Sequence, residues 1–221
     1  MKKSGKNTLF SGVIFISLFI VWTFLITTVD VKPVGVNGTD VGFATINTWF
    51  HNLTGVNMTL YTITDWLGLV PVFICMIFGV VGLIQLIKRK SLLKVDFDIV
   101  VLGLYYVLVV FTYLLFEMIP INYRPILING FMEASYPSST TLLVLSVMPT
   151  LVFQVQRRLK NGKIKIIINI VPAVFSLFMV IGRLVSGVHW VTDIIGSCLL
   201  SAGLFFIYKS IVLLRSKANG I

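Results

Sequence analysis

The sequence predicts an all-α integral membrane protein, a bundle of six transmembrane helices, and three observations predict it. Of the 221 residues, 57% are hydrophobic and only 12% are charged, whereas soluble domains have about 45–50% apolar and about 25% charged residues. Mean hydropathy is +0.98. Six apolar runs are long enough to cross a hydrocarbon core, which takes about 20 helical residues. Basic residues gather in alternate connections between these runs. This composition excludes a soluble enzyme and a disordered chain.

The six expected spans follow one another as a single membrane domain, without a linker or an internal repeat. They cover roughly 9–29, 67–87, 97–117, 138–156, 165–184 and 191–213. The first run follows three lysines, but it is too long for a signal peptide and has no cleavage site, so we expect it to be retained.

The longest connection, 30–66, is rich in apolar and aromatic residues, and two structures are compatible with it. It forms either a short helix lying on the membrane with one apolar side or an irregular loop with interfacial aromatics. The residues of that apolar side would be Val41, Phe43, Ile46, Trp49, Phe50 and Leu53.

The distribution of basic residues predicts the orientation of the chain. Fifteen of the 18 lysines and arginines lie at the N-terminus, in the second and fourth connections or near the C-terminal end. Cytoplasmic loops carry such an excess, so we expect both termini in the cytoplasm. Lys32, Arg124 and Arg183 then lie on the extracytoplasmic side. The two arginines border spans there, where a basic side chain either snorkels to lipid headgroups or has a specific ligand.

Several classes of site and partner are unexpected for this composition. Cys75 and Cys198 both lie inside apolar runs, and His51 and His189 are the two histidines, so we expect no disulfide framework, no metal site and no cofactor. The net charge of +10 is explained by membrane orientation rather than by a nucleic-acid partner. No span carries a charge near its midpoint, which makes a transport pathway the weaker hypothesis.

Residues 182–193, between the last two spans, carry the strongest chemical signal. Arg183 is followed by His189 six residues later and by Asp193 four residues after that. A carboxylate four residues from an imidazole on one helical face fixes its tautomer, and an arginine reaching across the turn at Gly187 holds an anion. This set suits a nucleophilic histidine that attacks phosphorus. The alternative is an interfacial histidine beside an aspartate helix cap.

Two further segments have features of phosphate sites. Tyr136-Pro137-Ser138-Ser139-Thr140-Thr141 predicts a helix N-terminus, where free N–H groups of Ser138, Ser139 and Thr140 bind phosphate, although simple capping is the alternative. Arg124 precedes Pro125 and offers a planar fork for phosphate oxygens. Both segments are expected on the same extracytoplasmic side as Arg183 and His189. The orientation is predicted from bulk charge alone, so the motifs support it independently.

With these motifs the chain resembles the type 2 phosphatidic acid phosphatase superfamily, integral-membrane lipid phosphate phosphatases with six spans. The resemblance covers roughly 117–200 and rests mainly on Arg183, His189 and Asp193. It implies that His189 forms a phosphohistidine and that Asp193 supports it. Arg124-Pro125 matches the end of the first family motif, and Pro137-Ser138 matches the start of the second.

Three positions depart from the family pattern. Glu117 replaces a lysine of the first motif, Gly182 replaces a serine of the third, and Thr140 replaces the histidine that protonates the leaving oxygen. General acid catalysis is worth typically about 10²–10⁴-fold, and threonine cannot supply it. A diphosphate substrate would need little protonation, or Glu133 or His51 would act as the substitute acid. The third possibility is a pocket that binds a lipid phosphate without turnover.

The sequence therefore predicts a metal-independent membrane phosphatase that hydrolyses a lipid phosphate or polyprenyl diphosphate at the extracytoplasmic face. The alternative is a catalytically impaired relative that binds a lipid phosphate headgroup. Expected partners are the lipid substrate and membrane lipids; the sequence does not predict an oligomeric state.

Overall fold

The computed structural model describes residues 2–218, and this part of the chain is almost entirely helical, with three isolated β-bridges and no strand. Six helices are long and apolar enough to cross a membrane. They are α1 (Lys2–Thr28), α4 (Leu69–Arg89), α5 (Phe97–Met118), α6 (Ser139–Arg158), α7 (Gly162–Val185) and α8 (Val191–Ala218). The predicted fold class is confirmed, and each helix lies over one of the six expected spans.

The connection between α1 and α4 is more ordered than a loop. It contains α2 (Ala44–Thr54) and α3 (Met58–Leu67). On α2, the side chains of Ile46, Trp49 and Leu53 are exposed, as the helical alternative expects. Phe43 instead precedes α2 and stacks on Trp22 of α1, with ring centroids 5.0 Å apart.

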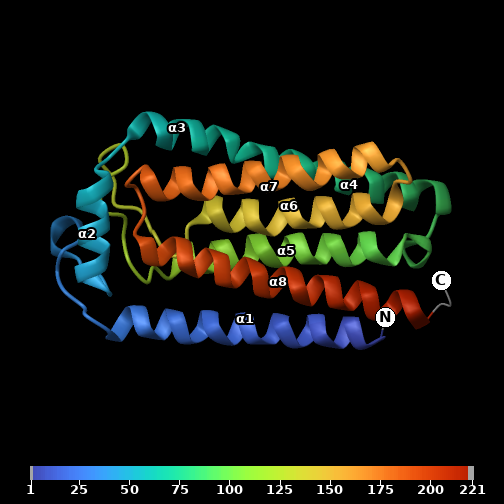
Figure 1. Ribbon diagram of the computed structural model, residues 1–221, viewed down its shortest axis with the longest axis horizontal. Coiled ribbons are helices and arrows are strands. Elements are labelled where there is room, and N and C mark those ends of the chain that lie inside the picture. The colour runs from blue at the N-terminus through green and yellow to red at the C-terminus, as the bar shows by residue number, and fades with distance from the viewer. Residues whose placement is uncertain (1, 219–221) are drawn as a thin grey trace.

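Helix α3 was not expected from the sequence, because its polar residues interrupt the apolar run. The Asn57 side chain caps it by accepting the Leu60 N–H at 2.9 Å. Helix α3 leads into α4 through Gly68. Helical structure therefore starts before residue 67, where the second span was expected to begin. In Figure 1, α3 and α4 form one continuous edge of the bundle.

Helices α6 and α8 are the most buried of the six, and α1 packs along α8 (Figure 1). Small residues allow that close approach: a Cβ on Gly12 would meet Ile207 at 2.8 Å, and one on Gly203 would meet Ile16 at 2.7 Å. Close packing through small residues is the usual way that helices associate within a bilayer.

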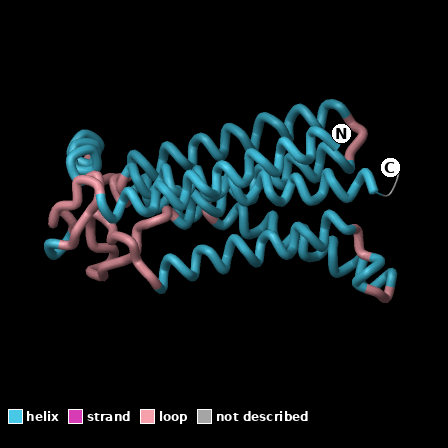
Figure 2. The backbone as a smooth tube through the Cα atoms, turned by 90° about the horizontal axis from the view of Figure 1, so that it is seen from below, coloured by secondary structure: helices cyan, strands magenta, loops and turns pink. Residues whose placement is uncertain are grey.

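The two ends of the bundle differ in what they hold. Figure 2 shows most of the loop segments gathered at one end, and in Figure 1 α2 lies crosswise there. Both termini lie at the opposite end, with the short connections around 90–96 and 159–161 (Figure 1). All three segments singled out by their chemistry lie at the loop-rich end, near the N-termini of α6 and α8.

Candidate active site

The turn between α7 and α8 brings Arg183 and His189 together. Gly187 has φ +71°, and a Cβ there would lie 2.0 Å from the carbonyl oxygen of Gly55. The Asn57 N–H donates to the Ser186 carbonyl at 3.0 Å, which further joins the turn to the start of α3. The turn therefore requires glycine at 187, both for its backbone conformation and for its close approach to the neighbouring loop.

Asp193 lies in the first turn of α8, whereas His189 precedes the helix. The two therefore do not share a helical face, as the spacing suggested. The Asp193 carboxylate accepts the Trp190 N–H at 2.8 Å and so caps the helix. It also lies 3.6 Å from His189, measured from Oδ2 to Nδ1. Capping and contact with the imidazole, which the sequence offered as alternatives, occur together.

A serine connects the imidazole to the carboxylate. The Ser135 hydroxyl donates to Asp193 Oδ2 and lies 3.2 Å from His189 Nδ1. Asn122 donates to the other carboxylate oxygen at 3.1 Å. All three of Ser135, Asn122 and Asp193 are buried. The carboxylate is thus fixed by three donors besides any bond from the imidazole.

These contacts determine which imidazole nitrogen is free. Because the Ser135 hydroxyl donates its hydrogen bond to Asp193, its oxygen is left to accept a hydrogen bond from His189 Nδ1–H. Nε2 then keeps its lone pair, and it lies 3.4 Å from Nη2 of Arg183. Burial lowers the pKa of His189 to about 4, an effect that the Asp193 contact opposes and the charges of Arg124 and Arg183 reinforce. The imidazole is therefore neutral near pH 7, as a nucleophile must be.

Two buried arginines lie near the same aromatic ring, that of Tyr61. The guanidinium of Arg183 lies 4.8 Å from the ring centroid of Tyr61 and that of Arg124 lies 5.8 Å from it. Arg183 is 1% exposed and Arg124 is 8% exposed. Nε and Nη1 of both side chains have no hydrogen-bond partner. Buried cations with unused donors are costly unless an anion completes them, so the arrangement points to an anion-binding site.

Short backbone pairing within 119–138 positions Arg124. The Arg124 N–H donates to the Glu133 carbonyl at 3.1 Å, and the Ser135 N–H donates to the Asn122 carbonyl at 3.0 Å. This pairing places Arg124 and Ser135 on one small unit, so that the arginine and the serine of the histidine network are held together.

Two carboxylates contact the arginines from the outer, more exposed side. Glu133 Oε2 lies 3.2 Å from Arg124 Nη2, and Asp65 Oδ1 lies 3.5 Å from Arg183 Nη1. The side chains of Glu133 and Asp65 are 37% and 56% exposed. Each arginine thus has one partly exposed carboxylate near it and keeps donors that make no hydrogen bond.

The N-terminus of α6 reaches the same site, but its three candidate residues differ. Both donors of Ser138 are already used, since its N–H contacts the Asp193 carbonyl at 3.4 Å and its hydroxyl donates to Thr141 at 3.1 Å. Ser139 and Thr140 lie in the first turn of α6, where N–H groups have no intrahelical acceptor. We therefore expect Ser139 and Thr140, rather than Ser138, to contact an anion.

Glu117 lies closer to the histidine than a residue at the end of a span need be. A small pocket is lined by Glu117, Pro137, Ser139 and His189. The sequence left open whether Glu117 faces the site or points away. This shared pocket places it beside the imidazole.

His51 lies at the margin of the site. Its ring is 5.7 Å from that of Trp190, and its Nδ1 is buried without a partner. Burial lowers the pKa of His51. It does not line the pocket that holds His189 and Glu117.

Several residues of the site had not been predicted. Tyr61 and Asp65 come from the unexpected helix α3, Ser135 carries no recognisable motif, and Asn122 lies in the segment Asn122-Tyr123-Arg124-Pro125, in which only Arg124 and Pro125 were given a role. An acidic residue such as Asp65, next to an apolar span of a chain with eight acidic residues, was the one available signal.

The fold and the site together define a class of protein, a helical membrane protein with six candidate spans among its described residues and a buried histidine beside a buried arginine. A comparison with known families gives the particular family, since the pattern described as the PAP2 superfamily matches residues 105–217, just over half of the chain. The chain belongs to the PAP2 superfamily.

A solved structure has the same fold. It is described as the crystal structure of the first transmembrane PAP2 type phosphatidylglycerolphosphate phosphatase from Bacillus subtilis, and it superposes with a TM-score of 0.66 at 19% sequence identity. The match covers 92% of this chain and 96% of that one. No curated protein matches the sequence. The two proteins therefore share one transmembrane helical fold.

Proposed function

We propose that this protein hydrolyses a lipid phosphate or a polyprenyl diphosphate at the extracytoplasmic face through a phosphohistidine. The observation that carries the proposal is His189 Nε2 beside Arg183, in a site where Arg183 and Arg124 are both buried and keep donors without hydrogen bonds. Arginine forks match phosphate oxygens, and a lone pair 3.4 Å from one of them is placed to reach the phosphorus of a bound phosphate.

The reaction would proceed in two displacements. His189 Nε2 forms a bond to phosphorus while the bond to the lipid oxygen breaks, and Asp193 stabilises the charged imidazole through Ser135. Water then attacks the phosphohistidine, which releases inorganic phosphate and restores the neutral imidazole. Arg124, Arg183 and the N–H groups of Ser139 and Thr140 would stabilise the charge on the transferred phosphoryl group.

An apolar groove supports a lipid as the substrate. It has a volume of about 480 Å³ and is lined at one end by Asp65, Ser139 and Thr140. From there it runs between α4, α5 and α6 along side chains such as Val72 and Val109. A substrate with its phosphate at the arginines would place its hydrocarbon chain in this groove.

Thr140 occupies the position at which the family has its general acid. Another group would therefore have to protonate the leaving oxygen. The Glu133 carboxylate is already paired with Arg124, at 3.2 Å. Glu117 shares the pocket of His189 and has no recorded ion pair among the described residues. We therefore propose Glu117 as the better-placed substitute acid, ahead of Glu133 and His51. A diphosphate substrate would make an acid unnecessary.

A substrate panel in detergent tests the proposal. A short-chain lipid monophosphate and a prenyl diphosphate are offered with EDTA present, and phosphate release is measured. We expect release from at least one of them, and a loss of about 10³-fold or more in His189→Ala, the range found when a catalytic nucleophile is removed. His51→Ala is the matched control and should keep most of the activity. Equal rates in His189→Ala and the unmodified protein would contradict the proposal.

A lipid-phosphate binder without turnover is the second candidate function. It is favoured by Thr140 at the acid position and by the carboxylates of Asp65 and Glu133 that already contact the arginines. Phosphate-dependent thermal stabilisation, lost in Arg183→Gln and not accompanied by phosphate release from either substrate, would support this candidate instead.

A further inference from the structure

A second cavity lies near the end of the bundle that holds both termini, away from the histidine. It has a volume of about 740 Å³, within the range of ligand-binding pockets. It is open to one side and lies between helices α6, α7 and α8, and apolar residues such as Leu145, Val152 and Phe205 form most of its wall. Pro149 and Pro172, which interrupt the hydrogen bonding of α6 and α7, also line it.

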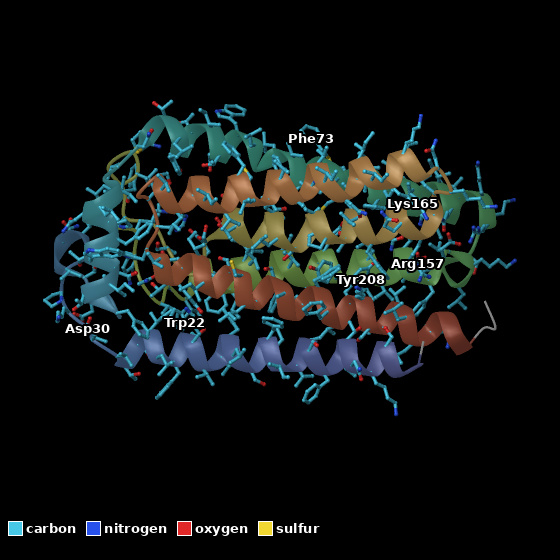
Figure 3. The ribbon with its side chains drawn as sticks, viewed as in Figure 1. Trp22, Asp30, Phe73, Arg157, Lys165 and Tyr208 are labelled. Atoms are coloured by element: carbon cyan, nitrogen blue, oxygen red, sulfur yellow. The ribbon has the colours of Figure 1, made fainter. Side chains whose placement is uncertain are left out.

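Two basic side chains border this cavity, and both lie on one aromatic ring. The guanidinium of Arg157 is 5.4 Å from the ring centroid of Phe153, and the ammonium of Lys209 is 5.9 Å from it. All three residues line the cavity. In Figure 3, Arg157 and Lys165 lie toward the end of the bundle opposite Asp30 and Trp22.

The charges of Arg157 and Lys209 are not compensated, in contrast to those of their neighbours. Arg158 lies 2.8 Å from Asp98 and 3.2 Å from Asp96, and Arg89 lies 2.7 Å from Asp96. The structure records no ion pair for Arg157 or Lys209 among the residues it describes. The acidic residues near this end of the bundle therefore neutralise one group of cations and leave the cavity positively charged.

We propose that this cavity binds one anionic phospholipid of the adjacent leaflet. Its phosphodiester would lie between Arg157 and Lys209, and its acyl chains would follow the apolar wall between α6, α7 and α8. Basic pockets between transmembrane helices on the cytoplasmic side characteristically hold anionic headgroups, and the basic-residue distribution predicts that this end is cytoplasmic. This site differs from the candidate active site in position, in lining residues and in the side of the bilayer it serves.

Native mass spectrometry of the full chain, released from detergent, tests the site. The protein is equilibrated with equal amounts of dioleoyl-phosphatidylglycerol and dioleoyl-phosphatidylcholine. We expect the unmodified protein to retain one more phosphatidylglycerol molecule than the R157Q/K209Q variant, whose affinity should be about 25-fold lower because each cation near an anionic headgroup contributes on the order of a factor of five. Lys160→Gln removes a charge from the neighbouring connection, outside the cavity, and should retain the lipid as the unmodified protein does.

A second variant tests the cavity without changing its charge. Ala173→Phe places a ring in the space expected for an acyl chain, and it should also lose the lipid while keeping a melting temperature within a few degrees of the unmodified protein. Equal retention in the unmodified protein, R157Q/K209Q and Ala173→Phe would overturn the proposal. Equal retention of phosphatidylcholine, or displacement of the lipid by inorganic phosphate alone, would overturn it as well.

Discussion

Arg158 and Arg183, at opposite ends of the bundle, differ in how completely their side chains are paired. At the end with the termini, Arg158 contacts Asp96 and Asp98 and donates from Nε to Gln154 at 3.0 Å, with a side chain that is 34% exposed. At the other end, Arg183 is 1% exposed, and its Nε and Nη1 have no hydrogen-bond partner. Its recorded contacts are a 3.5 Å approach to an exposed aspartate, the Tyr61 ring and the His189 imidazole.

This difference separates cations that are already paired within the protein from cations that are available to a ligand. A satisfied arginine at the surface contributes little to stability, typically about 0–1 kcal/mol for each exposed pair. A buried arginine with unused donors is unfavourable for folding by itself, so its retention in a site calls for a binding role. The comparison predicts that substitutions at the two arginines affect activity and stability separately.

The largest expected effect in this comparison is on activity, and it should follow replacement of Arg183, but not of Arg158, by glutamine. Arg183→Gln should lower kcat/KM by about 10²–10³-fold, the range for removing one donor to a developing charge, with little or no loss of thermal stability. Arg158→Gln should leave kcat/KM nearly unchanged and lower the melting temperature by a few degrees. The two measurements are phosphate release and thermal unfolding in detergent. Similar effects of both variants on activity would remove the distinction between the two ends.

Ser135→Ala should have the next largest effect, because it removes the hydroxyl between His189 and Asp193. The imidazole would lose its acceptor at Nδ1, and we expect kcat to fall by about 10- to 100-fold with a smaller change in KM, the range found when a group that orients a functional histidine is removed. Ser146→Ala is the control, since Ser146 Oγ is buried without a partner in the middle of α6. A purely structural role for Ser135 would instead appear as a loss of stability with kcat intact.

Thr140→His tests whether an acid is the missing part of the site. If so, it should raise the rate on a lipid monophosphate by about 10-fold or more, toward the lower range of general acid catalysis. The rate on a prenyl diphosphate should change little, because phosphate is already a stable leaving group. An unchanged rate on the monophosphate would favour Glu117 as the acid or a pocket built for diphosphates, and Glu117→Gln then distinguishes these two.

The smallest expected effect is on the pH dependence of stability. Burial holds the pKa of His189 near 4 in the folded protein, whereas an unfolded histidine has a pKa of about 6.5. Between these values the unfolded chain binds a proton that the folded chain does not, so stability falls as the pH decreases from about 6.5 to 4. The melting temperature should therefore fall by a few degrees more in the unmodified protein than in His189→Ala. Parallel curves for the two proteins would contradict a neutral, buried His189.

The spans could be predicted from the sequence because each depends on local composition. An apolar run of about 20 residues must form a helix in a bilayer, where every backbone polar group needs an internal partner. The same reasoning missed α3, because residues such as Thr62, Thr64 and Asp65 make that segment polar. Its helix is stabilised by the Asn57 cap and by packing against α7, which no local pattern reports.

The candidate site divides in the same way. Reactive and charged side chains are rare in this apolar chain, and three of them have the spacing of a known motif. The sequence could therefore select His189, Asp193, Arg183 and Arg124. The sequence by itself therefore determined the six helices and the residues that can carry chemistry. Only the tertiary structure decided that Ser135 joins the imidazole to its carboxylate, that both arginines lie against the Tyr61 ring and that Glu117 lines the small pocket of His189. These contacts join residues far apart in the sequence, and their distances are set by the packing of the helices together with the backbone pairing within 119–138.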